Sequence, residues 1–144
     1  MVDLNIDKYV ESYEVSLASI DVQNNLRSLP NELSIGLKCG ILEKRFSKEV
    51  QVPIAIDLVG RETNNENLLF KVSLVYNNYL KVNNIEEFEE KMNRDDFKKK
   101  FDDYAYFLVQ PVLNSTVQDI MAKVGINSIN IPKALGKDGT NNNI

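Results

Sequence analysis

Carboxylates are the only abundant side chains in this sequence that could carry out acid–base chemistry. The chain has 144 residues, no histidine and one cysteine. Four glutamates lie between residues 86 and 90, beside Lys91 and Arg94, a pattern typical of a solvated, charged helix face. Glycosidase-type chemistry needs two carboxylates that face each other across a pocket. Because the sequence isolates no such pair, we expect no catalytic residues and no enzymatic activity.

The other polar groups favour structural roles. Without histidine, Ser-His-Asp and Cys-His catalysis and His-based zinc sites are excluded. Cys39 lies in an apolar alternation with only Lys38 as a neighbouring cation, which indicates a buried thiol in a reducing compartment. Residues 114–116 follow Pro111 and are better placed to satisfy backbone groups that the proline frees than to act as nucleophiles. No glycine-rich phosphate loop occurs, so we expect neither a metal nor a cofactor.

The charge balance bears on partners and location. Lys and Arg number 17 and Asp and Glu 21, a formal net charge of −4. The basic run Lys98–Lys100 has acids on both sides, so we expect no nucleic-acid partner. Residues 1–10 lack the basic start and apolar run of a signal peptide, and no stretch approaches the ~18 apolar residues of a membrane span. We therefore expect a cytoplasmic protein with one domain over residues 1–135 and a flexible, Gly/Asn-rich tail over 136–144.

Period-two alternation of apolar residues predicts four long strands. It runs over residues 32–46, 49–62 and 68–82, and more weakly over 13–22. The short connection between Phe46 and Val50 favours an antiparallel hairpin. Because Pro53 cannot donate a ladder hydrogen bond, its strand is expected to lie at a sheet edge or to be bulged at the proline.

Helical spacing replaces the alternation after residue 84. We expect a short helix around residues 86–92 and a long one that begins near Asp95 as its N-cap. The apolar stripe of the long helix runs from Phe101 to Val124, and Gly125 is its expected stop. Pro111 should kink or restart it because proline removes a backbone hydrogen bond. The fold class that follows is α+β, a four-stranded antiparallel sheet followed by a short helix and a long C-terminal helix.

One long helix cannot cover the apolar faces of four long strands. The segment with Ile126, Ile129 and Ile131 adds apolar side chains outside any expected helix. Small domains rarely expose such surface unless it binds something, a second copy of the chain included. Two interpretations stay open, and they are compatible: a homo-oligomer that buries its own surface, and a hydrophobic groove for extended peptides.

The order of elements and several motifs resemble the SecB family of export chaperones. Residues 106–114, YFLVQPVLN, are similar to the aromatic and aliphatic, proline-containing start of the family's main helix. Gly125 and the segment Ile129–Pro132 are similar to the exit of that helix into its connecting loop. Phe70–Val82 resembles the family's fourth strand. The likeness covers Tyr13 to Pro132.

The resemblance implies an ATP-independent holding chaperone of bacterial type, a homotetramer built as a dimer of dimers. Clients would bind extended in grooves floored by the sheet and walled by the loop after the main helix. The client would be a preprotein in protein export, or one dedicated protein such as an antitoxin. The client-binding residues that the resemblance suggests are Tyr76, Tyr79, Leu80, Phe107, Ile126, Ile129 and Ile131.

Two departures from the family bear on delivery to the export motor. The family usually has a second helix after the loop, whereas residues 133–144 are too short and too rich in Gly and Asn to form one. The acidic patch with which the family's sheet receives the motor has no assignable counterpart. We keep as the alternative a structural or interaction module of the same fold, which buries its apolar surface in a homo-oligomer and has no chaperone activity.

Overall fold

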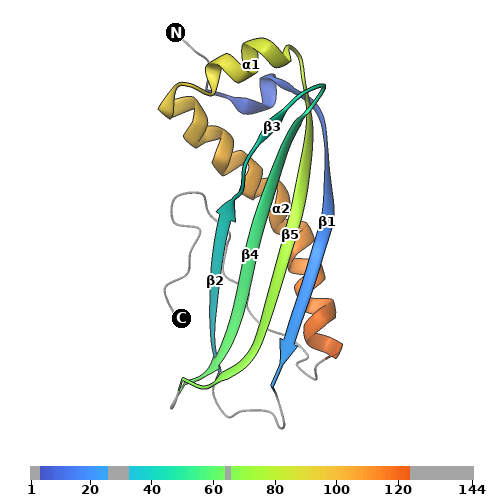
Figure 1. Cartoon of the computed structure of the whole chain (residues 1–144), viewed down its shortest axis with the longest axis vertical. Helices are drawn as coiled ribbons and strands as arrows, with labels where there is room; N and C mark the ends of the chain where they lie inside the picture. Colours follow the sequence, from blue (N-terminus) through green and yellow to red (C-terminus); the bar gives the residue numbers. More distant parts are fainter. Residues whose placement is uncertain (1–3, 26–32, 64–65, 124–144) are drawn as a thin grey trace.

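The computed structural model describes residues 4–25, 33–63 and 66–123. They form an antiparallel sheet with a short and a long helix, which confirms the predicted α+β class (Figure 1). In chain order the elements are the 3-10 helix η1 (Ile6–Lys8), β1 (Val10–Asn24), β2 (Leu33–Ile41), β3 (Arg45–Phe46), β4 (Val50–Glu62), β5 (Leu68–Val82), α1 (Ile85–Lys91) and α2 (Asp95–Lys123). No helix within the described residues is long and apolar enough to cross a membrane.

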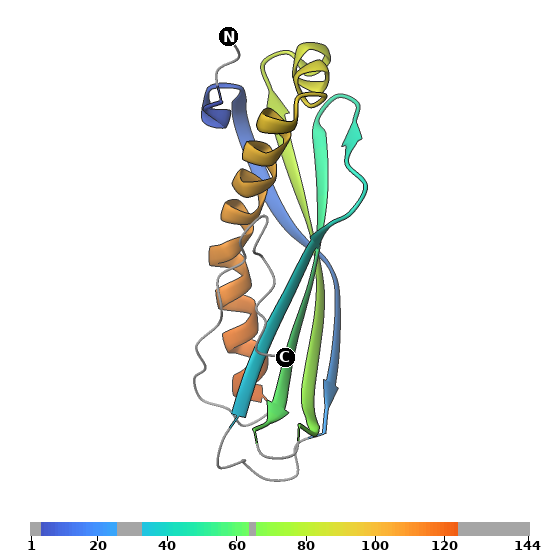
Figure 2. The same ribbon diagram turned by 90° about the vertical axis from the view of Figure 1, so that its left-hand side faces the viewer.

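The sheet contains the four predicted long strands, except that the run predicted over residues 32–46 is divided into β2 and the two-residue β3. Its order is β1-β5-β4-β2, and the two-residue β3 pairs with β4. All pairs are antiparallel. The predicted hairpin closes where Phe46 pairs with Val50. β1 and β2 follow each other in the chain, yet they lie at opposite edges of the sheet (Figures 1 and 2).

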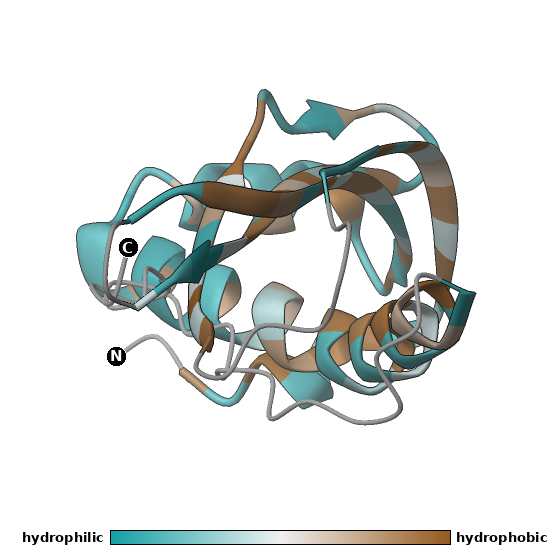
Figure 3. Ribbon diagram, turned by 90° about the horizontal axis from the view of Figure 1, so that it is seen from below, coloured by the Kyte–Doolittle hydropathy of each residue, from teal (hydrophilic) through white to brown (hydrophobic). Residues whose placement is uncertain are grey.

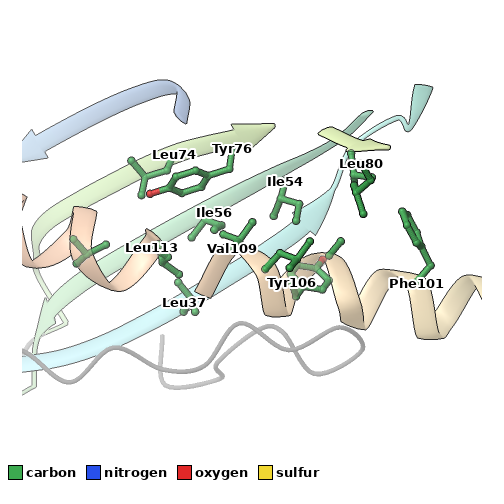
Figure 4. Packing of buried hydrophobic residues seen from close by; sticks show 14 of the residues in the cluster. Leu37, Ile54, Ile56, Leu74, Tyr76, Leu80, Phe101, Tyr106, Val109 and Leu113 are labelled. Carbon is green, nitrogen blue, oxygen red and sulfur yellow. The ribbon is translucent and has the colours of Figure 1, made fainter. Parts of the chain in front are cut away.

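α2 covers one face of the sheet, and the alternation in the strands decides which side chains it covers. In β4 and β5 the even-numbered residues from Val50 to Leu58 and from Phe70 to Val82 are buried, while most residues between them are half-buried on the opposite face. Figure 4 shows Ile54, Ile56 and Leu74 pointing toward Val109 and Leu113 of α2. The core therefore lies between α2 and the two central strands.

The structure corrects the expectation for Pro53. β4 is an interior strand, with β5 on one side and β2 and β3 on the other. The irregularity lies in the segment that faces Pro53. There β2 ends at Ile41, and pairing with β4 resumes only at Arg45, in β3. The Pro53 carbonyl accepts a hydrogen bond from the Leu42 amide at 2.9 Å. The side of β4 on which the proline lacks an N–H therefore faces this interruption, where no regular ladder donor is needed.

The helices match the sequence closely, with two differences. α1 is capped by Asn84, whose side chain accepts a hydrogen bond from the Glu87 amide at 3.1 Å. Asp95 is the first residue of α2 and not its N-cap. α2 continues through Pro111 without a restart, because the burial of its apolar stripe outweighs one lost hydrogen bond at an exposed position. The predicted stop at Gly125 lies outside the described residues.

Aromatic side chains fix the start of α2 against the end of the sheet. The Phe88 ring of α1 lies 5.3 Å from those of Phe97 and Phe101 of α2, in edge-to-face geometry. Tyr9, just before β1, completes the cluster at 5.5 Å from Phe97. This cluster sets the position from which α2 runs along the sheet (Figure 2).

Candidate functional site

A row of apolar side chains on β1 continues the core but is left uncovered. Directly opposed residues in an antiparallel pair share a face, so the partners of buried β5 residues also lie on the α2 side of the sheet. The β1 residues and their partners are Tyr13↔Leu80, Leu17↔Tyr76, Ile20↔Leu74 and Val22↔Val72. The β5 partners are buried, whereas the β1 residues, here named the β1 row, are exposed: Tyr13 55%, Leu17 41%, Ile20 50% and Val22 39%.

The backbone of β1 is also available along its outer edge. Within the described residues β1 pairs only with β5, so one side of a 15-residue strand has no ladder partner. Seen along the long axis, the sheet is a curved layer with α2 on one side only (Figure 3). A long edge strand with exposed apolar side chains is a template for pairing with another chain.

The start of β1 is anchored to α2 by Tyr104. Burial, and then the interaction of its hydroxyl with the Asp7 carboxylate of η1, raise the pKa of Tyr104 to about 12. The phenol therefore stays neutral at physiological pH. Only Val10 and Val15 of β1 are partly buried against the core, so the β1 row from Leu17 onward is open.

The seven residues proposed from the sequence fall into three groups. Tyr76 and Leu80 are fully buried under α2, which leaves them no exposed surface for a client. Tyr79 is half-buried on the opposite face of the sheet, and Phe107 is 73% exposed on α2. Ile126, Ile129 and Ile131 lie outside the described residues. The β1 row was not among the proposed residues, although the weak alternation over 13–22 already carried its signal.

A second surface lies at the other edge, where the connection from β2 to β3 approaches the start of α2. It consists of two adjoining hollows of about 400 and 470 Å³, here named the corner groove. Both hollows are lined by Ile41, Lys44 and Lys98. The larger one adds Leu42, Glu43, Phe46 and Met92, and the smaller one adds Asp95, Lys99, Asp102, Asp103 and Tyr106.

Charged groups cross the corner groove. The Lys44 ammonium lies 3.0 Å from an Asp102 carboxylate oxygen, which ties the β2–β3 connection to α2. The Lys44 side chain is only 13% exposed. Tyr106 forms part of the wall, and burial, reinforced by Cys39 and Asp102, raises its pKa to about 12. The groove thus combines neutral aromatic and aliphatic side chains with three lysines and four carboxylates.

The face of the sheet opposite α2 carries charges of both signs. Lys38 of β2 pairs with Asp57 of β4, and Asp57 pairs with Ser73 of β5. At the far end, Lys81 lies 3.8 Å from Glu11 of β1. At 0.1 M salt, the electric fields of such closely spaced opposite charges largely cancel at distances beyond about 10 Å. The described part of this face therefore presents mixed charge to a partner.

Comparison with known proteins relates the fold to one class. No family model matches the chain, and no curated protein sequence is significantly similar to it. A solved structure, the SecB-like chaperone of Mycobacterium tuberculosis in complex with a ChAD peptide from the HigA1 antitoxin, is similar with a TM-score of 0.69 at 10% sequence identity. The match covers 88% of this chain and 92% of that chain. At this identity the likeness shows a SecB-like fold, as the sequence motifs implied.

Proposed function

We propose that this protein is an ATP-independent, chaperone-like protein that binds extended, non-native polypeptide. The observation that carries the proposal is the β1 row, four large apolar side chains exposed on an edge strand that has no second partner within the described residues. Burying roughly 100 Å² of apolar client surface is worth about 2.5 kcal/mol and needs no particular client sequence. Unpaired backbone groups add hydrogen bonds that any extended chain can satisfy. The proposed activity is not enzymatic and uses no cofactor.

The proposed client is one dedicated protein. The similar mycobacterial structure holds a peptide from an antitoxin, which supports an extended client of this kind. The mixed charge of the face opposite α2 also favours a dedicated client over delivery to an export motor through an acidic patch. We place the protein in a bacterial cytoplasm as a homo-oligomer, a dimer or a dimer of dimers, in line with the resemblance.

The test is suppression of aggregation without ATP. An unfolded model protein is diluted into buffer with this protein at one- to fivefold molar ratio, and light scattering is followed. We expect a delay that is reduced several-fold by combined Leu17→Ser and Ile20→Ser. The matched control is combined Ser16→Ala and Ser19→Ala, which changes the opposite face of the same strand. No delay at fivefold excess of the unaltered protein would contradict the proposal.

The alternative, a structural module without chaperone activity, rests on the same exposed edge. If β1 of one copy pairs permanently with another copy, the β1 row is buried in the oligomer. Fluorescence of the hydrophobic dye ANS separates the two functions. Strong binding to the native oligomer, lost in the Leu17→Ser and Ile20→Ser variant, supports client binding. Negligible dye binding by a stable oligomer supports the structural module.

A further inference from the structure

A break in the pairing register divides β1 into two stretches. Residues 12–17 pair with β5 without interruption, and so do residues 19–24, but the register shifts between Leu17 and Ser19. Ala18, between them, has no partner in the register, which is the arrangement of a β-bulge. A bulge bends its strand and disrupts the ladder locally. A strand added along the outer edge of β1 therefore cannot keep one register with both stretches.

The two stretches present different apolar patterns on the α2 side of the sheet. In the first, Tyr13 and Leu17 are exposed four positions apart, and Val15 between them is partly buried against the core. In the second, Ile20 and Val22 are exposed two positions apart. Every residue of the second stretch is exposed, and none belongs to the core or packs against it. The second stretch thus offers a compact apolar pair beside an open backbone edge.

The size and charge of the second stretch favour a short extended segment over another folded copy as its occupant. Six residues of strand are about 20 Å long. A stable interface between folded proteins contains about 20–30 residues on each side. Two β1 strands paired antiparallel over both stretches, with their apolar faces together, would place Glu14 of each copy opposite Asp21 of the other. Like charges directly opposite each other destabilise a strand pair, and a flexible client is free of this constraint.

We infer that residues 19–24 bind an extended client segment that carries two large apolar residues two positions apart. Added as a further strand of the sheet, the segment places these two side chains opposite Ile20 and Val22. Its backbone pairs with the free edge of β1, and this pairing ends at Ala18. The inference rests on the proposed function and adds to it a binding stretch and a spacing of client residues.

The test compares three labelled ten-residue peptides of identical composition, in which two Phe residues in a Ser/Gly background are two, three or four positions apart. Fluorescence anisotropy measures their affinity for the full chain. We expect the two-apart peptide to bind at least fivefold more tightly than the three-apart peptide, whose Phe side chains point to opposite sides of an extended strand. Equal or tighter binding of the four-apart peptide would match Tyr13 and Leu17 instead and overturns the inference. The absence of binding by all three peptides also overturns it.

Paired variants locate the binding stretch. Combined Ile20→Ser and Val22→Ser should weaken the two-apart peptide at least fivefold. The matched control, combined Tyr13→Ser and Leu17→Ser, removes the same number of exposed apolar side chains and should change the affinity less than twofold. All four side chains are exposed, so both variants are expected to fold, which urea unfolding checks. Equal losses of affinity in the two variants overturn the inference.

Methylation of the peptide backbone tests strand pairing. In a sheet, only every second residue of a strand directs its N–H and C=O groups toward a given neighbour. Two further versions of the two-apart peptide carry N-methyl groups, one on odd-numbered and the other on even-numbered residues. We expect one version to lose binding and the other to stay within twofold of the unmethylated peptide. Equal affinity of the two versions overturns the pairing with β1.

The aggregation assay on the same preparations separates this inference from the proposed function. Delayed aggregation without discrimination among the three spacings overturns only the inferred binding stretch. Discrimination without any delay in aggregation overturns only the chaperone-like function.

Discussion

Cys39 shows how one half-buried group makes stability depend on pH. Burial, and secondarily the nearby Asp57 carboxylate, raise the pKa of its thiol from 9.0 to about 12. The thiol therefore stays protonated, and hence unreactive, over the physiological range. The apolar alternation predicts a buried thiol, whereas the structure leaves Cys39 half-buried beside the core.

The first prediction follows from that shift. Between pH 9 and about 12 the unfolded chain has lost the Cys39 proton while the folded chain keeps it, so the free energy of unfolding falls as pH rises. Tyr104 and Tyr106 add to the fall above pH 10. Urea unfolding at a series of pH values should show the decline, and Cys39→Ala should flatten the part between pH 9 and 10. An unchanged slope in that variant would contradict the assignment.

Gly60 is a position where only glycine fits. It is directly opposite Phe70 in the β4–β5 pair, on the α2 side of the sheet. A Cβ atom on Gly60 would lie 2.2 Å from the Phe70 ring. Both residues are buried, so the ring has little room to move.

The second prediction compares two glycines. Gly60→Ala should lower the free energy of unfolding by about 1–3 kcal/mol through overpacking. Gly40→Ala is the control, since no atom lies within 4 Å of its Cβ position. It should be neutral or gain up to about 1 kcal/mol from reduced backbone entropy. Combining Gly60→Ala with Phe70→Leu should recover part of the loss, and additive losses would contradict the clash.

At the scale of elements, one polar contact joins α2 to the sheet. Asn78 is the only buried polar residue of the described chain, and its amide donates to the Ala105 carbonyl of α2 at 3.1 Å. Its side-chain carbonyl has no hydrogen-bond partner in the structure. This directional bond among apolar contacts helps to fix how the helix is seated along β5.

The third prediction tests that seating. Asn78→Asp removes the donor and places a carboxylate against the Ala105 carbonyl, so we expect a loss of more than about 2 kcal/mol at pH 7. The loss should shrink as pH falls and the carboxyl group becomes protonated. Asn77→Asp, on the half-buried opposite face, is the control and should have a much smaller effect. Comparable losses in both variants, measured by urea unfolding, would contradict the role of Asn78.

The elements were predictable to the extent that local pattern determines them. Alternation identified β4 and β5, and helical spacing identified α1 and the start of α2 to within one or two residues, because burial repeats with the same period as the side chains. The place of Pro53 in an interior strand was not predictable, since it depends on an interruption in a different strand. Alternation likewise placed Tyr76 on an apolar face, but only the path of α2 decides that this face is covered.

For the whole molecule, the alternative function makes β1 the surface through which copies associate, and the β1 row would then be closed to a client. The β1 row and an unpaired backbone edge would both be satisfied by pairing with another copy. Association raises the melting temperature as protein concentration rises, because it stabilises only the folded chain. The sequence was least informative about association, since a surface that contacts a partner has no periodic pattern of its own.

The fourth prediction tests the structural module: if copies associate through β1, a charge placed in the β1 row should break the oligomer. Sedimentation should show oligomers of the 16.4 kDa chain, and the melting temperature should rise by a few degrees over a hundredfold range of concentration. Leu17→Asp should give monomers whose melting temperature no longer depends on concentration. Ser16→Asp, next to it on the opposite face, adds the same charge and should keep the oligomer. A monomeric unaltered protein at all concentrations would contradict the prediction.

The order of strands in the sheet also governs how the chain is made. β1 is the first strand to leave the ribosome, but its only neighbour within the described residues is β5, with Asn24 paired to Phe70 and Val10 to Val82. At about 5–20 residues per second, β1 waits several seconds for its partner to be synthesised. During that time β2 and β4 can pair, and β5 can then add to β4 as it emerges. β1 is thus added last to a sheet that already exists. In a nascent chain stalled before residue 68, β1 would be an unpaired segment with exposed apolar side chains.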